Sequence, residues 1–124
     1  MGLNSTLIQP LDSFDLDMEK IDLIKIDVEG MEEVVLKGIS ESIPAQFKIM
    51  IIFENWDPHF NFNKIKEYFS ERQTSLLILS KYTQYKKNWK RLFGETQLLL
   101  TPLESSEHNV GDIVAQIGNL VDLN

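Results

Sequence analysis

Two nearly continuous apolar segments, separated by an amphipathic one, constrain the fold of this 124-residue chain more than any other feature. Residues Ile21–Val28 are rich in β-branched side chains and are long enough for a largely buried strand. After this strand, apolar residues recur at intervals of three and four, which predicts an amphipathic helix. Its apolar stripe would comprise Val28, Met31, Val35 and Ile39. Lys48–Glu54 predicts a second buried strand, so the order strand, helix, strand indicates an α/β protein.

The rest of the chain continues this alternation. Asn61 is placed to cap a second helix. The apolar side of that helix would carry Phe62, Ile65 and Phe69, and further strands are expected at Ser75–Ser80, Thr96–Thr101 and Asp112–Gln116. Because parallel neighbours need a long crossover connection, usually a helix, we expect a mostly parallel sheet with flanking helices. No repeat or Gly/Ser-rich linker divides residues 1–124, which we interpret as one unit.

Charge and composition exclude several classes of protein. With 12 Lys and Arg against 19 Asp and Glu, the chain lacks the basic excess of a general nucleic-acid binder. Residues Asp12–Glu33 alone hold nine acids and two lysines. Lys81–Arg91 interleaves aromatic and basic side chains, but such a segment on an acidic protein is usually a solvated surface, so we expect no nucleic-acid partner. The absence of cysteine excludes disulfides and thiolate sites.

Export and membrane insertion are not indicated by the sequence. No apolar run approaches the roughly 18 residues of a membrane-spanning helix, and the first residues lack the pattern of a signal peptide. We therefore expect a cytoplasmic protein without a membrane partner.

Polar residues follow both predicted buried strands. Asp27 and Glu29 leave the first strand, and Glu54 and His59 leave the second, accompanied by Asn55 and Asp57. Because the carboxyl ends of parallel strands meet at one edge of a sheet, these side chains would gather where open α/β sheets bind ligands. They could act as a general base on a hydroxyl or coordinate a hard divalent cation, whereas the simplest alternative is that the acids cap the following helices.

The segment I-D-L-I-K-I-D-V-E-G-M-E-E-V-V-L-K-G, from Ile21 to Gly38, resembles the signature of the FkbM-type methyltransferases. Leu11-Asp12 before it and the strand ending in Glu54 after it follow in the order expected for that family. The resemblance implies a Rossmann-like class I fold that uses S-adenosylmethionine to methylate a hydroxyl of a small molecule or carbohydrate. In that fold Asp27, Glu29, Glu54 and His59 would face the acceptor, and one carboxylate would orient or deprotonate its hydroxyl. The resemblance implies no resident metal.

The same comparison with the family pattern shows a departure. The family's cofactor site contains a glycine-rich turn after the first strand, whereas the six glycines of this chain never form a closely spaced pair between a strand and a helix. The chain therefore resembles the C-terminal part of such a domain, a partial fold lacking the cofactor-binding strands. We expect a partner chain or a homo-oligomer to cover the exposed sheet edge. The alternatives are a non-catalytic binding or assembly module derived from a methyltransferase and a metal-dependent enzyme that uses the acidic cluster.

Overall fold

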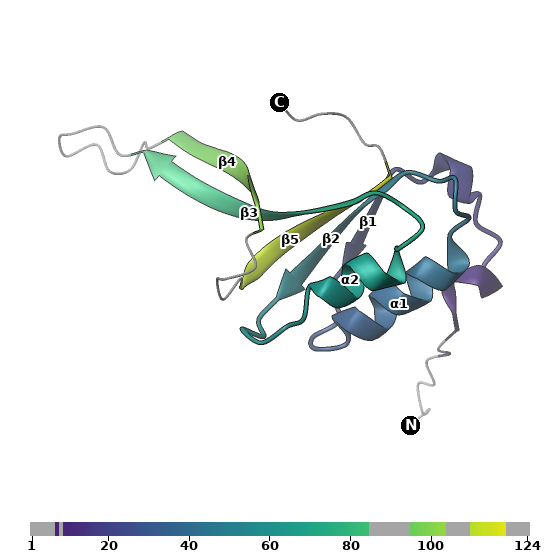
Figure 1. Cartoon of the computed structure of the whole chain (residues 1–124). Coiled ribbons are helices and arrows are strands. Elements are labelled where there is room, and N and C mark those ends of the chain that lie inside the picture. Colours follow the sequence, from purple (N-terminus) through teal and green to yellow (C-terminus); the bar gives the residue numbers. More distant parts are fainter. Residues whose placement is uncertain (1–6, 8, 85–94, 104–109, 119–124) are drawn as a thin grey trace, which may run out of the picture.

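The computed structural model describes residues 7, 9–84, 95–103 and 110–118, and the side chains of residues 80–98 lie outside that description. Within these ranges, two short 3-10 helices precede five strands and two α-helices (Figure 1). In chain order the elements are the 3-10 helices Leu11–Ser13 and Met18–Lys20, then β1 (Leu23–Ile26), α1 (Glu32–Ser42), β2 (Ile49–Asn55), α2 (Asn63–Tyr68), β3 (Thr74–Gln84), β4 (Glu95–Pro102) and β5 (Gly111–Ile117). The predicted α/β class is confirmed for this part of the chain.

The five strands form one mixed sheet in the order β1-β2-β5-β3-β4. Among the described strands only β1 and β2 pair in parallel, whereas β2 with β5, β5 with β3, and β3 with β4 are antiparallel. The expectation of a mostly parallel sheet was therefore wrong. The physical reason is the position of β5. β2 and β3 run in the same direction, but the last strand lies between them and pairs with both in antiparallel fashion.

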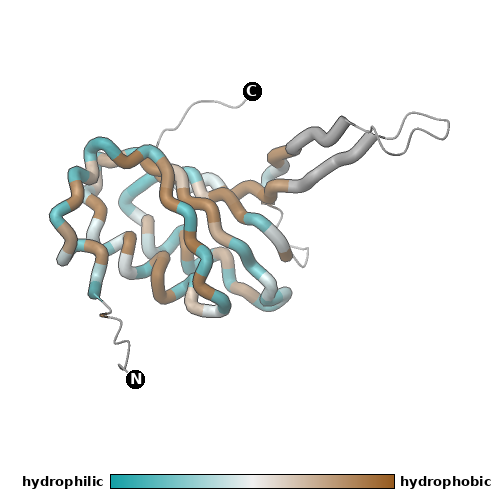
Figure 2. Tube along the Cα trace, turned by 180° about the vertical axis from the view of Figure 1, so that it is seen from behind, coloured by the Kyte–Doolittle hydropathy of each residue, from teal (hydrophilic) through white to brown (hydrophobic). Residues whose placement is uncertain are grey.

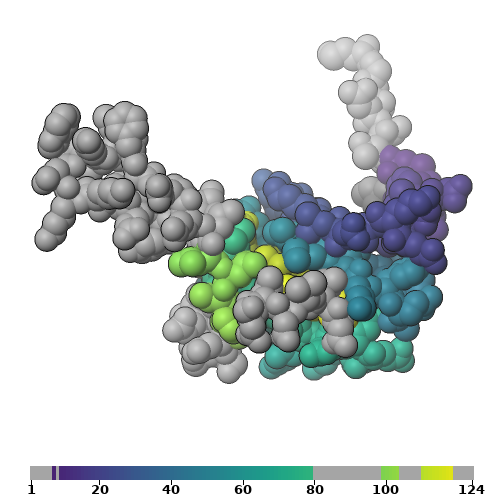
Figure 3. All heavy atoms as spheres, turned by 90° about the horizontal axis from the view of Figure 1, so that it is seen from above, coloured from purple at the N-terminus to yellow at the C-terminus, as the bar shows by residue number. Residues whose placement is uncertain are grey.

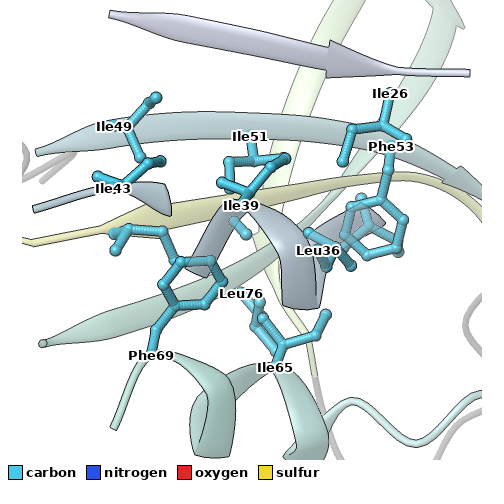
Figure 4. Close-up of a cluster of buried hydrophobic side chains, with 13 residues drawn as sticks. Ile26, Leu36, Ile39, Ile43, Ile49, Ile51, Phe53, Ile65, Phe69 and Leu76 are labelled. Carbon is cyan, nitrogen blue, oxygen red and sulfur yellow. The ribbon is translucent and has the colours of Figure 1, made fainter. Parts of the chain in front are cut away.

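Both described helices lie on one face of the sheet (Figure 1). Along β2 the residues alternate between full and partial burial, so that every second side chain faces the helices. Figure 4 shows Ile51 of β2 beside Ile39 of α1, and Phe53 beside Leu36. Ile65 of α2 and Phe69, the residue after that helix, point toward the same cluster. Brown, hydrophobic and teal, hydrophilic stretches alternate along the described chain in Figure 2. Ile65 and Phe69 confirm the apolar side predicted for α2.

The buried side of α1 differs from the predicted stripe. Leu36 and Ile39 are fully buried and Val35 packs against the core, but Met31 is 58% exposed and Val28 is 36% exposed. The difference arises at Glu29 and Gly30, whose positive φ angles of 33° and 91° form a turn that resets the phase between strand and helix. α1 then continues through Gly38 and ends at Ser42, two residues before Pro44.

β1 is an edge strand, because it pairs with β2 on one side and with no described strand on the other. Leu23 on this strand and Val34 on α1 are 51% and 64% exposed. Seen from above, purple and indigo residues of the N-terminal third form one border of the molecule (Figure 3). An unpaired strand edge with an exposed apolar side chain, that of Leu23, therefore lies on this side of the described structure.

Neither described α-helix is long and apolar enough to cross a membrane.

Candidate functional site

The parallel pairing of β1 and β2 brings two of the predicted site residues to the same level of the sheet. Ile26 pairs with Phe53, and the next residues in the chain are Asp27, directly after the end of β1, and Glu54 of β2. Ile26 and Phe53 face the helices and are buried, whereas Asp27 is exposed and Glu54 is partly exposed. The alternation of side chains therefore directs both carboxylates to the face of the sheet opposite the helices.

A third carboxylate, that of Asp112, joins this level from the other side. The antiparallel register of β2 and β5 places Asp112 directly opposite Glu54. Residues in direct opposition point to the same face of a sheet, and like charges so placed repel each other. Sequence reasoning missed this neighbour, because the local pattern of the last strand does not tell which strand it will pair with.

Glu29 lies in the turn that follows β1. Its φ of 33° is in the left-handed region, which is uncommon for a residue with a long side chain, and Gly30 follows with a φ of 91°. A backbone hydrogen bond of 3.2 Å from Met31 N to Val28 O closes the turn. The Glu-Gly pair of the motif thus has a structural role, and the Glu29 side chain is exposed beyond the end of β1.

His59 lies in the loop between β2 and α2 and is exposed. Its backbone N donates a hydrogen bond of 2.8 Å to Asp57 Oδ1. Asn55 is buried, donates through Nδ2 to Asp57 O and accepts from Asp57 N at Oδ1, at 3.0 and 3.1 Å. Asn55 and Asp57 therefore shape this loop, whereas neither α1 nor α2 has a side-chain hydrogen bond from its N-cap residue, as the capping alternative would require.

A polar cluster links α1 to α2. Glu33 Oε1 accepts hydrogen bonds of 2.8 Å from both Lys64 Nζ and Tyr68 Oη. The bond from Lys64, followed by the bond from Tyr68, holds the pKa of Glu33 below its ordinary value. The bond to Glu33 conversely raises the pKa of Lys64 and that of Tyr68. Local sequence pattern does not show this contact, because it joins residues 31 positions apart.

A cavity of about 410 Å³ opens beside the loop that follows β2. Its lining residues are Gly30, Glu32, Glu33, Asn55, Trp56, Asp57 and Phe60. Glu32 is fixed at one side, where its Oε1 accepts a hydrogen bond of 3.0 Å from Gly30 N. Trp56 is 70% exposed and leaves much of its ring to solvent. The sequence signal for this cavity was the abrupt change from apolar to polar residues after Phe53.

A metal centre has no support in the described structure. Among its residues, no group of three or more His, Cys, Asp or Glu side chains is arranged to hold a metal ion. The divalent-cation hypothesis therefore lacks a ligand set in this part of the chain.

The predicted site residues lie in a segment that matches a known protein family. Residues 8–77 match the sequence model of the methyltransferase FkbM domain. The chain belongs to the FkbM methyltransferase family. The match contains the four predicted site residues and the cavity, whereas Asp112 lies beyond it. No curated protein and no solved structure matches the chain.

FkbM methyltransferases as a family use S-adenosylmethionine. A nucleotide cofactor of this kind is commonly cradled by closely spaced glycines between a strand and a helix. Of the described glycines, Gly30 lies in the turn before α1, Gly38 lies inside that helix, and Gly111 and Gly118 flank β5. The described residues therefore do not fit the adenosine part of this cofactor. The basic segment Lys81–Arg91 lies largely outside the described residues.

Proposed function

We propose that residues 1–124 form the C-terminal, acceptor-side part of an S-adenosylmethionine-dependent O-methyltransferase domain of the FkbM type. The acceptor is a hydroxyl of a small molecule or carbohydrate. The family match over residues 8–77 supports the methyltransferase class. The single observation that carries the assignment of this edge is the position of Asp27 and Glu54 at one level, beyond a parallel strand pair inside the matched segment.

In this proposal the chain's own residues bind and orient the acceptor. Asp27 or Glu54 accepts the proton of the acceptor hydroxyl, which makes its oxygen a better nucleophile. Glu29, at the turn after β1, and His59, in the loop after β2, contact the acceptor from either side. Most of the rate gain comes from holding the hydroxyl in place, because a well-positioned reactant needs little further assistance.

The cofactor requires a second polypeptide segment in this proposal. Since the described residues do not fit its adenosine part, we propose that a partner segment or chain with the remaining strands joins the free edge of β1. Leu23, which is on β1 and exposed, supports such a contact, because an exposed apolar side chain on an unpaired strand favours pairing with another chain.

Equilibrium binding of S-adenosylmethionine to the chain tests whether the cofactor site needs a second polypeptide segment. We expect no binding even at millimolar cofactor. Micromolar affinity would show that the chain already holds a complete cofactor site and would overturn this part of the proposal.

Methyl transfer tests the catalytic assignment. In the assembly that transfers a labelled methyl group, Asp27→Asn or Glu54→Gln should lower kcat by about 100-fold or more, the usual contribution of a general base. Glu19→Gln, which removes an exposed acid from a 3-10 helix remote from the strand ends, is the matched control. Retention of full activity by both site variants would contradict the assignment.

A second candidate function is a non-catalytic binding or assembly module. The free edge of β1 is the observation that favours it, because such an edge can add a strand from another chain without any chemistry. Under this alternative, strand pairing at β1 persists while no preparation that contains the chain transfers a methyl group from S-adenosylmethionine to any hydroxyl acceptor.

A further inference from the structure

The cavity beside the loop after β2 has the size and the lining of a small-ligand site. Its volume of about 410 Å³ is within the range of pockets that enclose small organic molecules. It lies between the start of α1, represented by Gly30 and Glu32, and the loop residues Trp56 and Phe60. The Glu29-Gly30 turn on one side and buried Asn55 on the other give it a defined wall.

Two aromatic rings line the cavity in different ways. The Phe60 ring is held among neighbours, with its centroid 5.9 Å from that of Phe53 and 4.9 Å from that of Phe62. Trp56 directly follows the last buried residue of β2, yet it is 70% exposed. A tryptophan contributes little to a core in such a position, whereas its open ring face is the best aromatic surface for a cation.

The charged residues of the lining all have the same sign. Glu32, Glu33 and Asp57 contribute carboxylates, and none of the described residues that line the cavity is basic. Lys64 approaches from α2, but its ammonium is 2.8 Å from Glu33 Oε1 and offsets one of these charges. The remaining negative charge disfavours phosphate or carboxylate ligands and favours a cation. The described residues provide no cluster suited to a metal ion, which leaves an organic cation.

We propose that this cavity binds the protonated amine of the methyl acceptor, which is therefore an amino sugar or a related amino alcohol. The ammonium group contacts the face of Trp56 and is neutralised by Glu32 and Asp57. The assignment of a methyl acceptor rests on the proposed function, whereas the preference for an amine rests on the cavity alone. Gly30 lines the cavity and directly follows Glu29 in the chain, so the cavity adjoins the turn after β1.

Three sugars that differ at one position test the proposal without cofactor or activity. Glucosamine carries an ammonium group, N-acetylglucosamine carries an uncharged nitrogen, and glucose carries a hydroxyl. Binding is followed by the NMR shifts of the Trp56 indole N–H and the Gly30 amide in the full chain. We expect glucosamine to bind about five- to tenfold more tightly than either neutral sugar, as one cation–π and carboxylate contact allows. Equal binding of the three sugars would overturn the proposal.

Variants of the lining separate a specific site from a general attraction of cations. Glu32→Gln keeps an oxygen that can accept from Gly30 N but removes the charge, and Trp56→Leu removes the ring. Each should abolish most of the preference for glucosamine. Glu41→Gln makes the same charge change on the same helix outside this cavity and should leave the preference intact. An equal loss in the Glu41 variant would show that only net charge acts.

The outcome also separates this proposal from the proposed function. Glucosamine binding at Trp56 in a chain that never supports methyl transfer would retain the amine site and reject the methyltransferase assignment. Methyl transfer to neutral sugars without any glucosamine preference would retain the methyltransferase assignment and reject the amine site.

Discussion

The segment from β1 to α2 and the segment from β3 to β5 build their parts of the sheet in different ways. In the first, a crossover helix joins two parallel strands, and the polar residues lie where those strands end. In the second, the strands pair only in antiparallel fashion. The family match covers the first segment and reaches only the beginning of the second. The predicted site residues therefore belong to the crossover segment, while the antiparallel segment pairs with β2 on the side away from β1.

The largest expected change in stability comes from a variant that disrupts the packing of the crossover segment. Leu36 of α1 is fully buried against the sheet, so Leu36→Ala should reduce the free energy of unfolding by about 2 to 5 kcal/mol. Urea unfolding measures this change. Val34→Ala on the same helix, at a side chain that is 64% exposed, should cost less than about 0.5 kcal/mol. Similar losses in the two variants would contradict the described orientation of α1.

A smaller effect concerns the turn between β1 and α1. Glu29 has a positive φ, which asparagine tolerates better than glutamate. Glu29→Asn should therefore raise the free energy of unfolding by about 0.5 kcal/mol. Glu29→Gln removes the same charge without easing the backbone, and it should leave the stability nearly unchanged. A gain in the Gln variant as large as that in the Asn variant would attribute the effect to charge.

The next smaller effect concerns the pairing of β2 with β5, where the two segments meet. Glu54 and Asp112 are directly opposite each other there, and their like charges disfavour the pairing. Asp112→Asn should raise the free energy of unfolding at neutral pH by about 0.3 kcal/mol, and by less in high salt. Thermal unfolding at two salt concentrations measures the gain. A salt-independent change would mean that the two carboxylates do not repel each other.

The smallest effect concerns the polar contact between α1 and α2. Hydrogen bonds from Lys64 and Tyr68 hold the pKa of Glu33 below its ordinary value of 4.5. The stability that Glu33 contributes is therefore fully present above that pH and is lost as the pH falls through the lowered pKa. Glu33→Gln should make the acid branch of the stability curve shallower, as urea midpoints across a pH series would show. Glu41→Gln changes an exposed acid of the same helix and serves as the control. An identical change in the acid branch of that variant would show that the contact of Glu33 with Lys64 and Tyr68 is not the cause.

Local sequence pattern predicted the elements of the crossover segment well, because each depends on periodicity within a few residues. The strand after Ile21, the strand ending near Glu54 and the buried Ile65 and Phe69 are examples. The exposure of Met31 could not be predicted in this way, because the preceding turn changes which side of α1 faces the sheet.

Non-local pairing explains what the sequence could not show. The insertion of β5 between β2 and β3 is decided by strand edges that meet only in the folded chain. For the same reason the neighbour of Glu54 and the contact of Glu33 with Lys64 were missed. The proximity of Asp27 and Glu54 was predictable, since a short parallel crossover brings the ends of its two strands together.

The free edge of β1 also bears on how copies of this chain meet in solution. The strand is only four residues long, and Asp22 and Asp27 stand on either side of it within the acidic segment Asp12–Glu33. Two copies joined edge to edge would bring these carboxylates together at neutral pH, which opposes their pairing. We therefore expect the charges that flank β1 to disfavour edge-to-edge pairing of two copies and to favour a partner strand that carries basic residues.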